Sequence, residues 1–157
     1  MEAIWMHTIR NMFKQLHWAN ERILEHLRTQ ADNKQVVRLF AHILHSEKAW
    51  FTRLSGKDSS HIPFWPDADL SDCSRLVDEN NANFSAYLSV IETNGNLEDV
   101  IAYKSITGAS YATSVRNILT HLALHGQYHR GQINTILRSA GGEPVNVDYI
   151  TYIRELS

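Results

Sequence analysis

Residues 121–133 read HLALHGQYHRGQI and carry the strongest signal in the chain. They lie inside a longer segment, from Thr113 to about Ser139, whose apolar residues recur at intervals of three and four. That spacing is typical of an amphipathic α-helix. At about 100° per residue, His129 falls near the centre of the apolar stripe, His125 just to one side and His121 at its edge. The segment is therefore predicted to turn histidines inward.

Two of these histidines have the spacing of a metal-binding pair. His125 and His129 are four positions apart, which places two imidazoles on one helix face within reach of a single ion. The alternative is a pair of core histidines bonded to neighbouring side chains, since buried polar groups need partners. The spacing alone leaves both interpretations open.

Three further segments have helical periodicity, and they run from Glu2 to about Arg28, from Val36 to Leu54 and from Cys73 to Ile91. The chain has only seven glycines and three prolines, so helix breakers are few. Four long amphipathic helices predict an all-α fold, a four-helix bundle. A length of 157 residues predicts one domain, over residues 1–157.

Polar residues mark where two of these helices begin. Asp32 and Asn33 are candidate N-caps of the second helix, and Asp69 or Ser71 of the third. The side-chain oxygen of such a residue accepts from a backbone N–H that the first helical turn leaves unpaired. Helix starts are therefore expected directly after these positions.

Some segments depart from the helical pattern. Residues 62–66, Ile-Pro-Phe-Trp-Pro, hold two prolines and are predicted to form a loop whose aromatic side chains pack. Residues 100–103 and 106–108 are strand-like. They predict a short extended excursion or hairpin between the third and fourth helices. Residues 145–157 are expected to lie along the bundle as a short tail.

Every helix is expected to turn a polar residue inward. Asn20 interrupts the stripe of the first helix, Glu47 lies near the middle of the second, and Asn80 with Asn81 interrupts the third. A buried polar group without a partner costs about 1–3 kcal/mol, so these residues and the histidines predict one shared polar site. The alternative is a hydrogen-bond network without a ligand, with Glu47 paired to an Arg or Asn.

The second helix offers three candidates for a third metal ligand. Glu47 lies closest to the middle of its apolar stripe, His42 lies well off the centre, and His45 lies roughly opposite the core. Periodicity alone therefore selects Glu47 before His42, and His45 last.

Composition excludes several classes of function. Fifteen Lys and Arg against seventeen Asp and Glu give a net charge of −2, and the absence of a basic block argues against nucleic-acid binding. The apolar runs fall short of the ~20 residues that span a membrane, and residues 1–13 lack a signal-peptide pattern. Nine histidines favour metal binding. Cys73, the single cysteine, suits a reducing compartment and is expected to be buried and inert.

Trp18 lies on the side of the first helix opposite its apolar stripe. An outward tryptophan often marks a contact surface. Trp18 is therefore expected in a homodimer contact or beneath the loop that carries Phe64 and Trp65.

Three segments resemble the DinB family of four-helix-bundle proteins, the DinB/YfiT-like group. Residues 121–133 are similar to its most characteristic segment, and residues 125–132 match its H-x-x-x-H-R-G-Q core. Residues 16–24, LHWANERIL, resemble the family's opening helix, and residues 41–50, AHILHSEKAW, its second-helix motif. The matches occur in the family's order and cover essentially the whole chain.

The resemblance implies a site for a divalent metal made by three histidines. Carried over to this sequence, the ligands are His42, His125 and His129. The resemblance thus favours His42 over Glu47, which becomes a supporting or packing residue, and leaves His45 and His121 as outer residues or spare donors. Nickel or zinc is the expected ion, because imidazole suits both.

The resemblance also implies a class of function. It predicts a cytoplasmic, homodimeric, metal-dependent enzyme that acts as a thiol S-transferase on a low-molecular-weight thiol, or as a hydrolase. Three imidazoles leave coordination positions open for a substrate, as in catalytic sites. The alternatives are a metal- or small-molecule-binding stress protein without turnover, and a purely structural dimerisation bundle.

Overall fold

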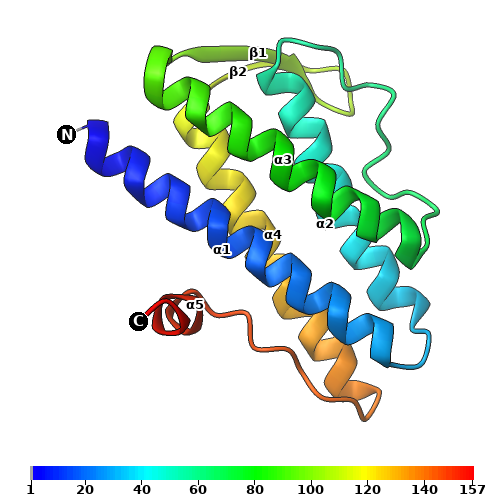
Figure 1. Cartoon of the computed structure of the whole chain (residues 1–157). Coiled ribbons are helices and arrows are strands. Elements are labelled where there is room, and N and C mark those ends of the chain that lie inside the picture. The colour runs from blue at the N-terminus through cyan, green and yellow to red at the C-terminus, as the bar shows by residue number, and fades with distance from the viewer. Residues whose placement is uncertain (1) are drawn as a thin grey trace.

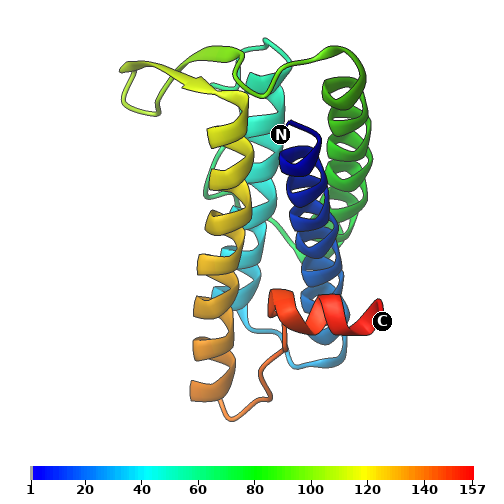
Figure 2. The same cartoon turned by 90° about the vertical axis from the view of Figure 1, so that its left-hand side faces the viewer.

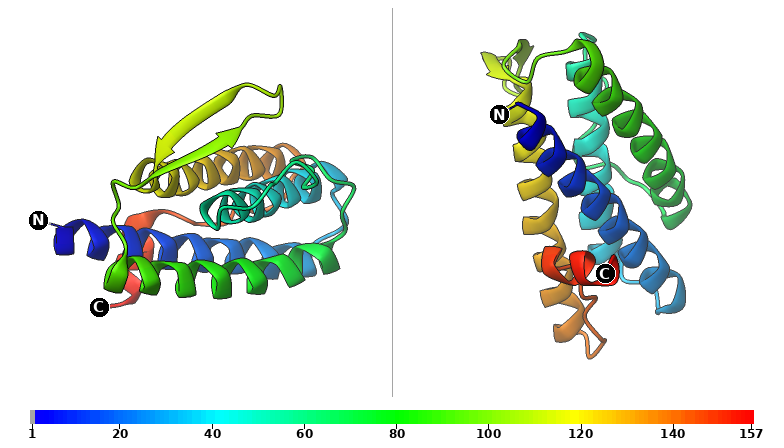
Figure 3. Two further views of the ribbon diagram at one scale, coloured as in Figure 1. Left: turned by 90° about the horizontal axis from the view of Figure 1, so that it is seen from above. Right: turned by 60° about the vertical axis from the view of Figure 1, so that its left-hand side comes forward.

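The computed structural model describes residues 2–157, with side chains from residue 4 onward, and its four long helices pack as the predicted bundle (Figure 1). The helices are α1 (Glu2–Thr29), α2 (Lys34–Leu54), α3 (Leu70–Asn94) and α4 (Val115–Ser139). Seen from above, α1 and α3 form one layer and α2 and α4 the other (Figure 3).

The helices do not alternate in direction. Helices α1 and α4 run one way along the bundle, and α2 and α3 run the other way (Figure 1). Two consecutive parallel helices need a connection that returns along the whole bundle, and residues 55–69 supply it along the outside of α2. This connection contains the proline-bounded segment 62–66, which is a loop as predicted. It brings Phe64 and Trp65 to the middle of α2.

The two predicted N-cap positions are confirmed. The side chain of Asn33 accepts a hydrogen bond from the backbone N–H of Val36, 3.2 Å away. Asp69 accepts from the backbone N–H of Asp72, and Asp72 accepts in return from the backbone N–H of Asp69. These bonds satisfy donors that the first helical turn leaves unpaired.

A β-hairpin joins α3 to α4, formed by β1 (Val100–Lys104) and β2 (Ser110–Ser114) in antiparallel register. The prediction of a hairpin is confirmed, but the second strand was expected at residues 106–108. Those residues lie in the turn, where Gly108 adopts a positive φ of 82°. The second strand therefore extends over Thr113, which was expected to begin the fourth helix.

The tail forms an unpredicted short helix, α5 (Tyr149–Glu155), which crosses α1 near one end of the bundle (Figure 2). It covers Trp18, whose Nε1 donates to Glu155 Oε2 at 2.9 Å and whose ring centre lies 5.6 Å from that of Tyr152. Helix α5, and not the Phe64–Trp65 loop, packs on Trp18, and the expected homodimer contact at this residue stays a prediction. A seven-residue helix is too short for periodicity to identify.

The core consists of two apolar clusters, one toward each end of the bundle, and all four long helices contribute to both. No helix in the described range 2–157 is long and apolar enough to cross a membrane. Cys73 lies in one cluster with no exposed surface, and burial raises the pKa of its thiol to about 12. A thiol in that environment is inert, as expected.

A polar layer separates the two clusters and takes one residue from each long helix. Asn20 of α1 and Asn80 of α3 donate to the two carboxylate oxygens of Glu47 on α2, at 2.9 and 3.0 Å. Arg130 of α4 donates from Nη1 to Asn20 Oδ1 at 2.7 Å. Gly126 leaves room for the guanidinium, since a Cβ there would lie 3.0 Å from Arg130 Nη1.

Burial dominates the titration of the two charged groups in this layer. Burial raises the pKa of Glu47 to about 7, although Asn20, Arg130 and Asn80 favour its charged form. Burial also lowers the pKa of Arg130 to about 10, against the attraction of Glu47. The charges of Glu47 and Arg130 therefore depend on each other and on the two amides.

The raised pKa of Glu47 predicts a pH-dependent contribution to stability. The folded chain binds this proton more tightly than the unfolded chain, whose carboxyl has a pKa near 4.5. The contribution is thus complete below about pH 4.5 and is lost as the pH rises through about 7. Urea unfolding in the presence of chelator should show that the stability of wild type relative to Glu47→Gln falls across this window. Parallel pH profiles would contradict the prediction; Glu25→Gln, at an exposed position on α1, is the control and should give a parallel profile.

Candidate metal centre

Three histidines meet at the seam between α2 and α4. His42 comes from α2, and His125 and His129 come from successive turns of α4. One ring nitrogen from each lies within 4.8 Å of those of the other two. The centres of the rings are 5.1 Å apart for His42 and His125, 4.6 Å for His42 and His129, and 4.5 Å for the α4 pair. The structure thus brings together the three residues that the sequence predicts as ligands.

Hydrogen bonds orient two of the imidazoles. His42 Nδ1 lies 2.7 Å from the backbone oxygen of Phe64, and His129 Nδ1 lies 2.6 Å from Gln132 Oε1. A carbonyl or amide oxygen only accepts, so Nδ1 donates in both cases and Nε2 keeps its lone pair. Metal-binding histidines are oriented in the same way, by a donor bond from the nitrogen that does not bind the ion.

The environment favours the neutral form of two imidazoles in this group. Burial lowers the pKa of His42, against the bond to Phe64. Burial also lowers the pKa of His125, and the neighbouring His129 and His42 lower it further, to about 3. A neutral imidazole is the form that binds a metal ion. These two residues are therefore in the form of a metal ligand at neutral pH.

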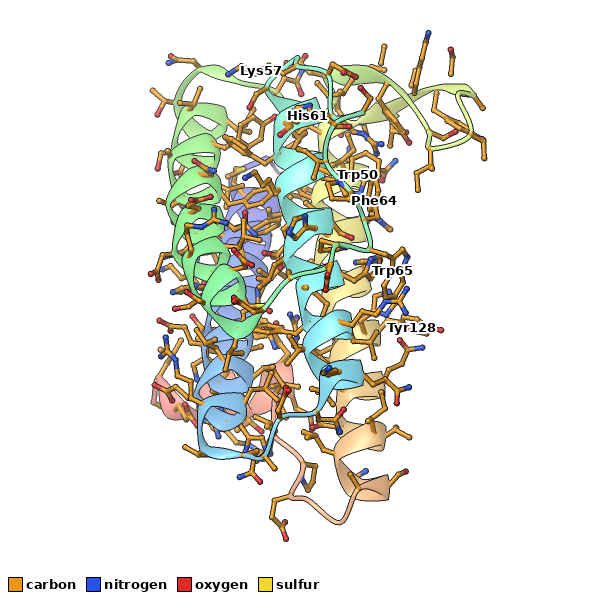
Figure 4. The ribbon with its side chains drawn as sticks, turned by 90° about the vertical axis from the view of Figure 1, so that its right-hand side faces the viewer. Trp50, Lys57, His61, Phe64, Trp65 and Tyr128 are labelled. Atoms are coloured by element: carbon orange, nitrogen blue, oxygen red, sulfur yellow. The ribbon has the colours of Figure 1, made fainter. Side chains whose placement is uncertain are left out.

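The connection between α2 and α3 covers the histidine group from outside. The Trp65 ring stacks on the His42 ring with 3.8 Å between centres and 3° between planes, and it meets His129 edge-on at 6.4 Å. Figure 4 shows Trp50, Phe64 and Trp65 following one another along this seam. His42 is only 6% exposed as a result. The loop thus buries a residue that an ideal helical wheel places at the flank.

The remaining histidines on these helices lie outside the group. His121 is exposed, one turn before His125, with its ring centre 5.3 Å from that of His125 and 5.5 Å from that of Trp50. Burial lowers the pKa of His45, and the charge of Asp72 at the start of α3 acts on this pKa in the opposite direction. His45 therefore faces α3 rather than α4.

The expectation that the histidines and the inward polar residues of the other helices form one shared site is wrong. Asn20, Asn80 and Glu47 form the polar layer on the bundle axis, whereas the histidines lie at the outer seam. The inward position of Glu47 was correctly predicted, and its partners are the amides and Arg130, as the alternative interpretation held. Helix α4 contributes Arg130 to the polar layer and two histidines to the group at the seam, and these are two separate polar centres.

Several supporting residues were missed in the sequence. Gln132 follows His129 by three positions, a spacing that places both on one helix face and offers a detectable signal. The carbonyl of Phe64 offers none, because a backbone acceptor has no sequence signature. Arg130 is fully buried, and the glycine four positions before it is the signal that was overlooked.

Comparisons with known proteins give the family and the fold of the chain. The model of the DinB family matches residues 6–155. Protein DinB of Bacillus subtilis (strain 168) is 22% identical over 151 residues, covering 87% of this chain and 88% of that protein. The crystal structure of a DinB-like protein from Bacillus cereus ATCC 10987 has the same fold, with a TM-score of 0.56, 15% identity and coverage of 92% of this chain and 93% of that one. With a family match over nearly its whole length, a four-helix bundle and the three-histidine group, the chain belongs to the DinB family.

Proposed function

We propose that the protein is a metal-dependent enzyme whose divalent ion, nickel or zinc, is held by His42, His125 and His129. The observation that carries this proposal is the convergence of three ring nitrogens within 4.8 Å of one another. Imidazole is a suitable ligand for both ions. No carboxylate or thiolate belongs to the group found among the described residues, so the ion would keep its full positive charge.

The residues around the group support catalysis rather than storage of the ion. An ion held by three imidazoles retains open coordination positions and promotes the ionisation of a thiol or water. The bonds to Phe64 and Gln132 fix His42 and His129 before any ion binds, which lowers the reorganisation that binding requires. Trp65 shields one side of the group from water.

Substrate access also favours an enzyme over a metal-storage protein. A hollow of about 610 Å³ is lined by Trp65 and Gln132, and a cavity of about 720 Å³ is lined by Trp65 and Phe64. Both therefore reach residues that contact the histidines. Neither lining includes the three histidines, so a small molecule in either hollow would lie against Trp65, which stacks on His42.

The substrate we propose is a low-molecular-weight thiol, with S-transfer as the reaction and hydrolysis as the second possibility. A thiolate is the attacking form of a thiol, and a bound ion stabilises it. We also propose a cytoplasmic homodimer. Leu124 and Tyr128, each 65% exposed on α4, offer apolar surface for such a contact.

The first prediction concerns the ligands. Alanine replacement of His42, His125 or His129 should each abolish stoichiometric binding of nickel or zinc, because two imidazoles hold the ion far less tightly than three. His45→Ala and His121→Ala are matched controls and should bind as wild type does. Calorimetric titration measures the effect. Loss of the metal in His121→Ala with retention in His42→Ala would contradict the proposed ligand set.

A second prediction concerns the orientation of His129. Gln132→Ala removes the acceptor for His129 Nδ1 and should weaken metal binding by about 10- to 100-fold, with little change in apo-protein stability. Thr135→Ala lies on the exposed side of the same helix and is the control. Equal affinities of Gln132→Ala and wild type would show that this bond does not prepare the site.

Removal of the metal should lower stability without unfolding the chain. An ion bound only to the folded state raises the melting temperature, so chelator should lower it at about pH 7.5. Burial lowers the pKa of His42 and that of His125, the latter to about 3, so protons compete weakly with the ion in mild acid and the chelator effect should persist at about pH 5. The helical circular dichroism should persist, since two apolar clusters remain. A chelator without effect at the higher pH would mean that the histidines hold no ion.

A further inference from the structure

A cavity of about 720 Å³ lies between the connection after α2 and the β-hairpin. Its lining includes Arg53 from α2, Lys57 and Phe64 from the connection, and Tyr103 and Lys104 from β1. Figure 4 shows Lys57 at the hairpin end of the molecule and Phe64 further along the α2–α4 seam. The cavity therefore extends from the hairpin end toward the histidine group.

Arg53 is the unusual residue of this lining, because it is a charged side chain that is only 7% exposed. Its Nε donates to Ser59 Oγ at 2.9 Å, and its Nη2 donates to the backbone oxygen of Lys104 at 3.2 Å. Its guanidinium carbon lies 4.5 Å from the centre of the Trp50 ring and 4.9 Å from that of Tyr103. All of these partners are neutral, so none compensates the charge.

Ion pairs within the described chain leave the charge of Arg53 unmatched. None of the salt bridges among described residues includes it. Asp58 is the acidic residue of the lining, but it is exposed and accepts from the backbone N–H and the hydroxyl of Ser60. Lys57 and Lys104 add two cations. A buried cation is costly without a counter-charge, and this cavity has an excess of positive charge.

The remaining walls are suited to an organic molecule. Ile62, Phe64 and Tyr103 contribute apolar and aromatic surface, which stabilises carbon groups by burial. A small inorganic anion would leave most of this surface in contact with water. The combination of a buried guanidinium and aromatic walls favours an organic anion.

The same residues connect the cavity to the metal centre. Phe64 lines the cavity and accepts the Nδ1 hydrogen bond of His42 through its backbone oxygen. Trp65 lines the cavity and stacks on the His42 ring. A molecule in the cavity is thus one layer of residues away from the proposed ion.

Other hollows lack this combination. The hollow of about 610 Å³ beyond Trp65 has one cation, Arg38, and that residue is exposed. A hollow of about 1000 Å³ mixes cations such as Arg28 and Lys34 with acidic residues such as Asp67 and Asp69. Neither presents a buried cation without an acidic neighbour.

We propose that the Arg53 cavity binds a small organic anion through a carboxylate or phosphate, and that this anion is the non-reacting end of the substrate of the metal centre. Arg53, Lys57 and Lys104 hold the charged end, and the aromatic walls hold the carbon chain. The second half of this inference rests on the proposed function, whereas the first half does not.

The first experiment compares naphthoate with its uncharged analogue naphthamide, using equilibrium dialysis against chelator-treated full-length protein. Naphthoate should bind at least about tenfold more tightly, because only its carboxylate meets the cations. Naphthyl phosphate should share this advantage if the cavity accepts both kinds of anion, and weaker binding than naphthoate would restrict it to carboxylates. Equal binding of naphthoate and naphthamide would overturn the proposal.

Matched charge variants locate the site. The double replacement Lys57→Gln with Lys104→Gln changes exposed side chains and should remove most of the preference for naphthoate. Lys14→Gln with Arg138→Gln makes the same change of net charge elsewhere and should preserve the preference. Arg53→Met tests the buried cation, with circular dichroism as the check on folding. An unchanged preference in the Lys57 and Lys104 variant would overturn the proposal even if Arg53→Met does not fold.

The second experiment tests the link to the metal centre. Mercaptohexanoate and mercaptohexanamide are added to nickel-loaded protein, and the sulfur-to-metal charge-transfer absorption is followed. The charged thiol should saturate at about tenfold lower concentration, and the Lys57 and Lys104 variant should lose this difference. Equal saturation by the two thiols would overturn the link.

The outcomes of the two experiments separate this inference from the proposed function. His125→Ala should lose nickel and keep its preference for naphthoate, because the cavity does not depend on the ion. Protein that binds nickel but does not prefer naphthoate disproves the anion cavity and leaves the metal centre intact. Protein that prefers naphthoate but binds neither nickel nor zinc disproves the metal centre, and with it the assignment of the anion as substrate.

Discussion

The buried carboxylate of Glu47 fixes how the four helices face one another. It accepts from Asn20 and Asn80, and Asn20 accepts from Arg130, so each long helix contributes one side chain to a single layer. A rotation of any helix would leave a buried polar group without a partner, at a cost of about 1–3 kcal/mol for a neutral group and more for a charge. Apolar packing alone tolerates small rotations far better. This layer therefore gives the bundle a unique arrangement.

The position of Arg130 determines the position of the histidines. Successive residues of an α-helix are about 100° apart, so when Arg130 points to the bundle axis, His129 must point to the side of α4. That side faces α2 and its covering loop, where His42 and Trp65 lie. His125, one turn earlier, follows His129 onto the same seam. The placement of the histidine group is thus a consequence of the polar layer, although the two share no side chain.

Local patterns in the sequence predicted the features that depend on interactions between residues close together in the chain. Periodicity located the four helices, and the bonds at Asn33 and Asp69 follow from the preference of helix starts for side-chain acceptors. Long-range contacts were not predictable in this way. The covering of Trp18 by α5 depends on Glu155, 137 positions later. The burial of His42 depends on the connection after α2, and a helical wheel carries no information on where that connection runs. Periodicity favoured Glu47, whereas the family motif selected His42, which lies in the histidine group.

The separation of the two polar centres has a chemical consequence. Had Glu47 joined the histidines, its negative charge would have offset part of the charge of an ion and weakened its effect on a bound thiol or water. Asn20 and Asn80 instead hold that carboxylate at the bundle axis. The histidine group is left without a carboxylate among the described residues, at a seam that a loop covers. The polar layer and the histidine group therefore use different polar residues of the same helices, and the histidine side chains can change without dismantling the layer that orients them.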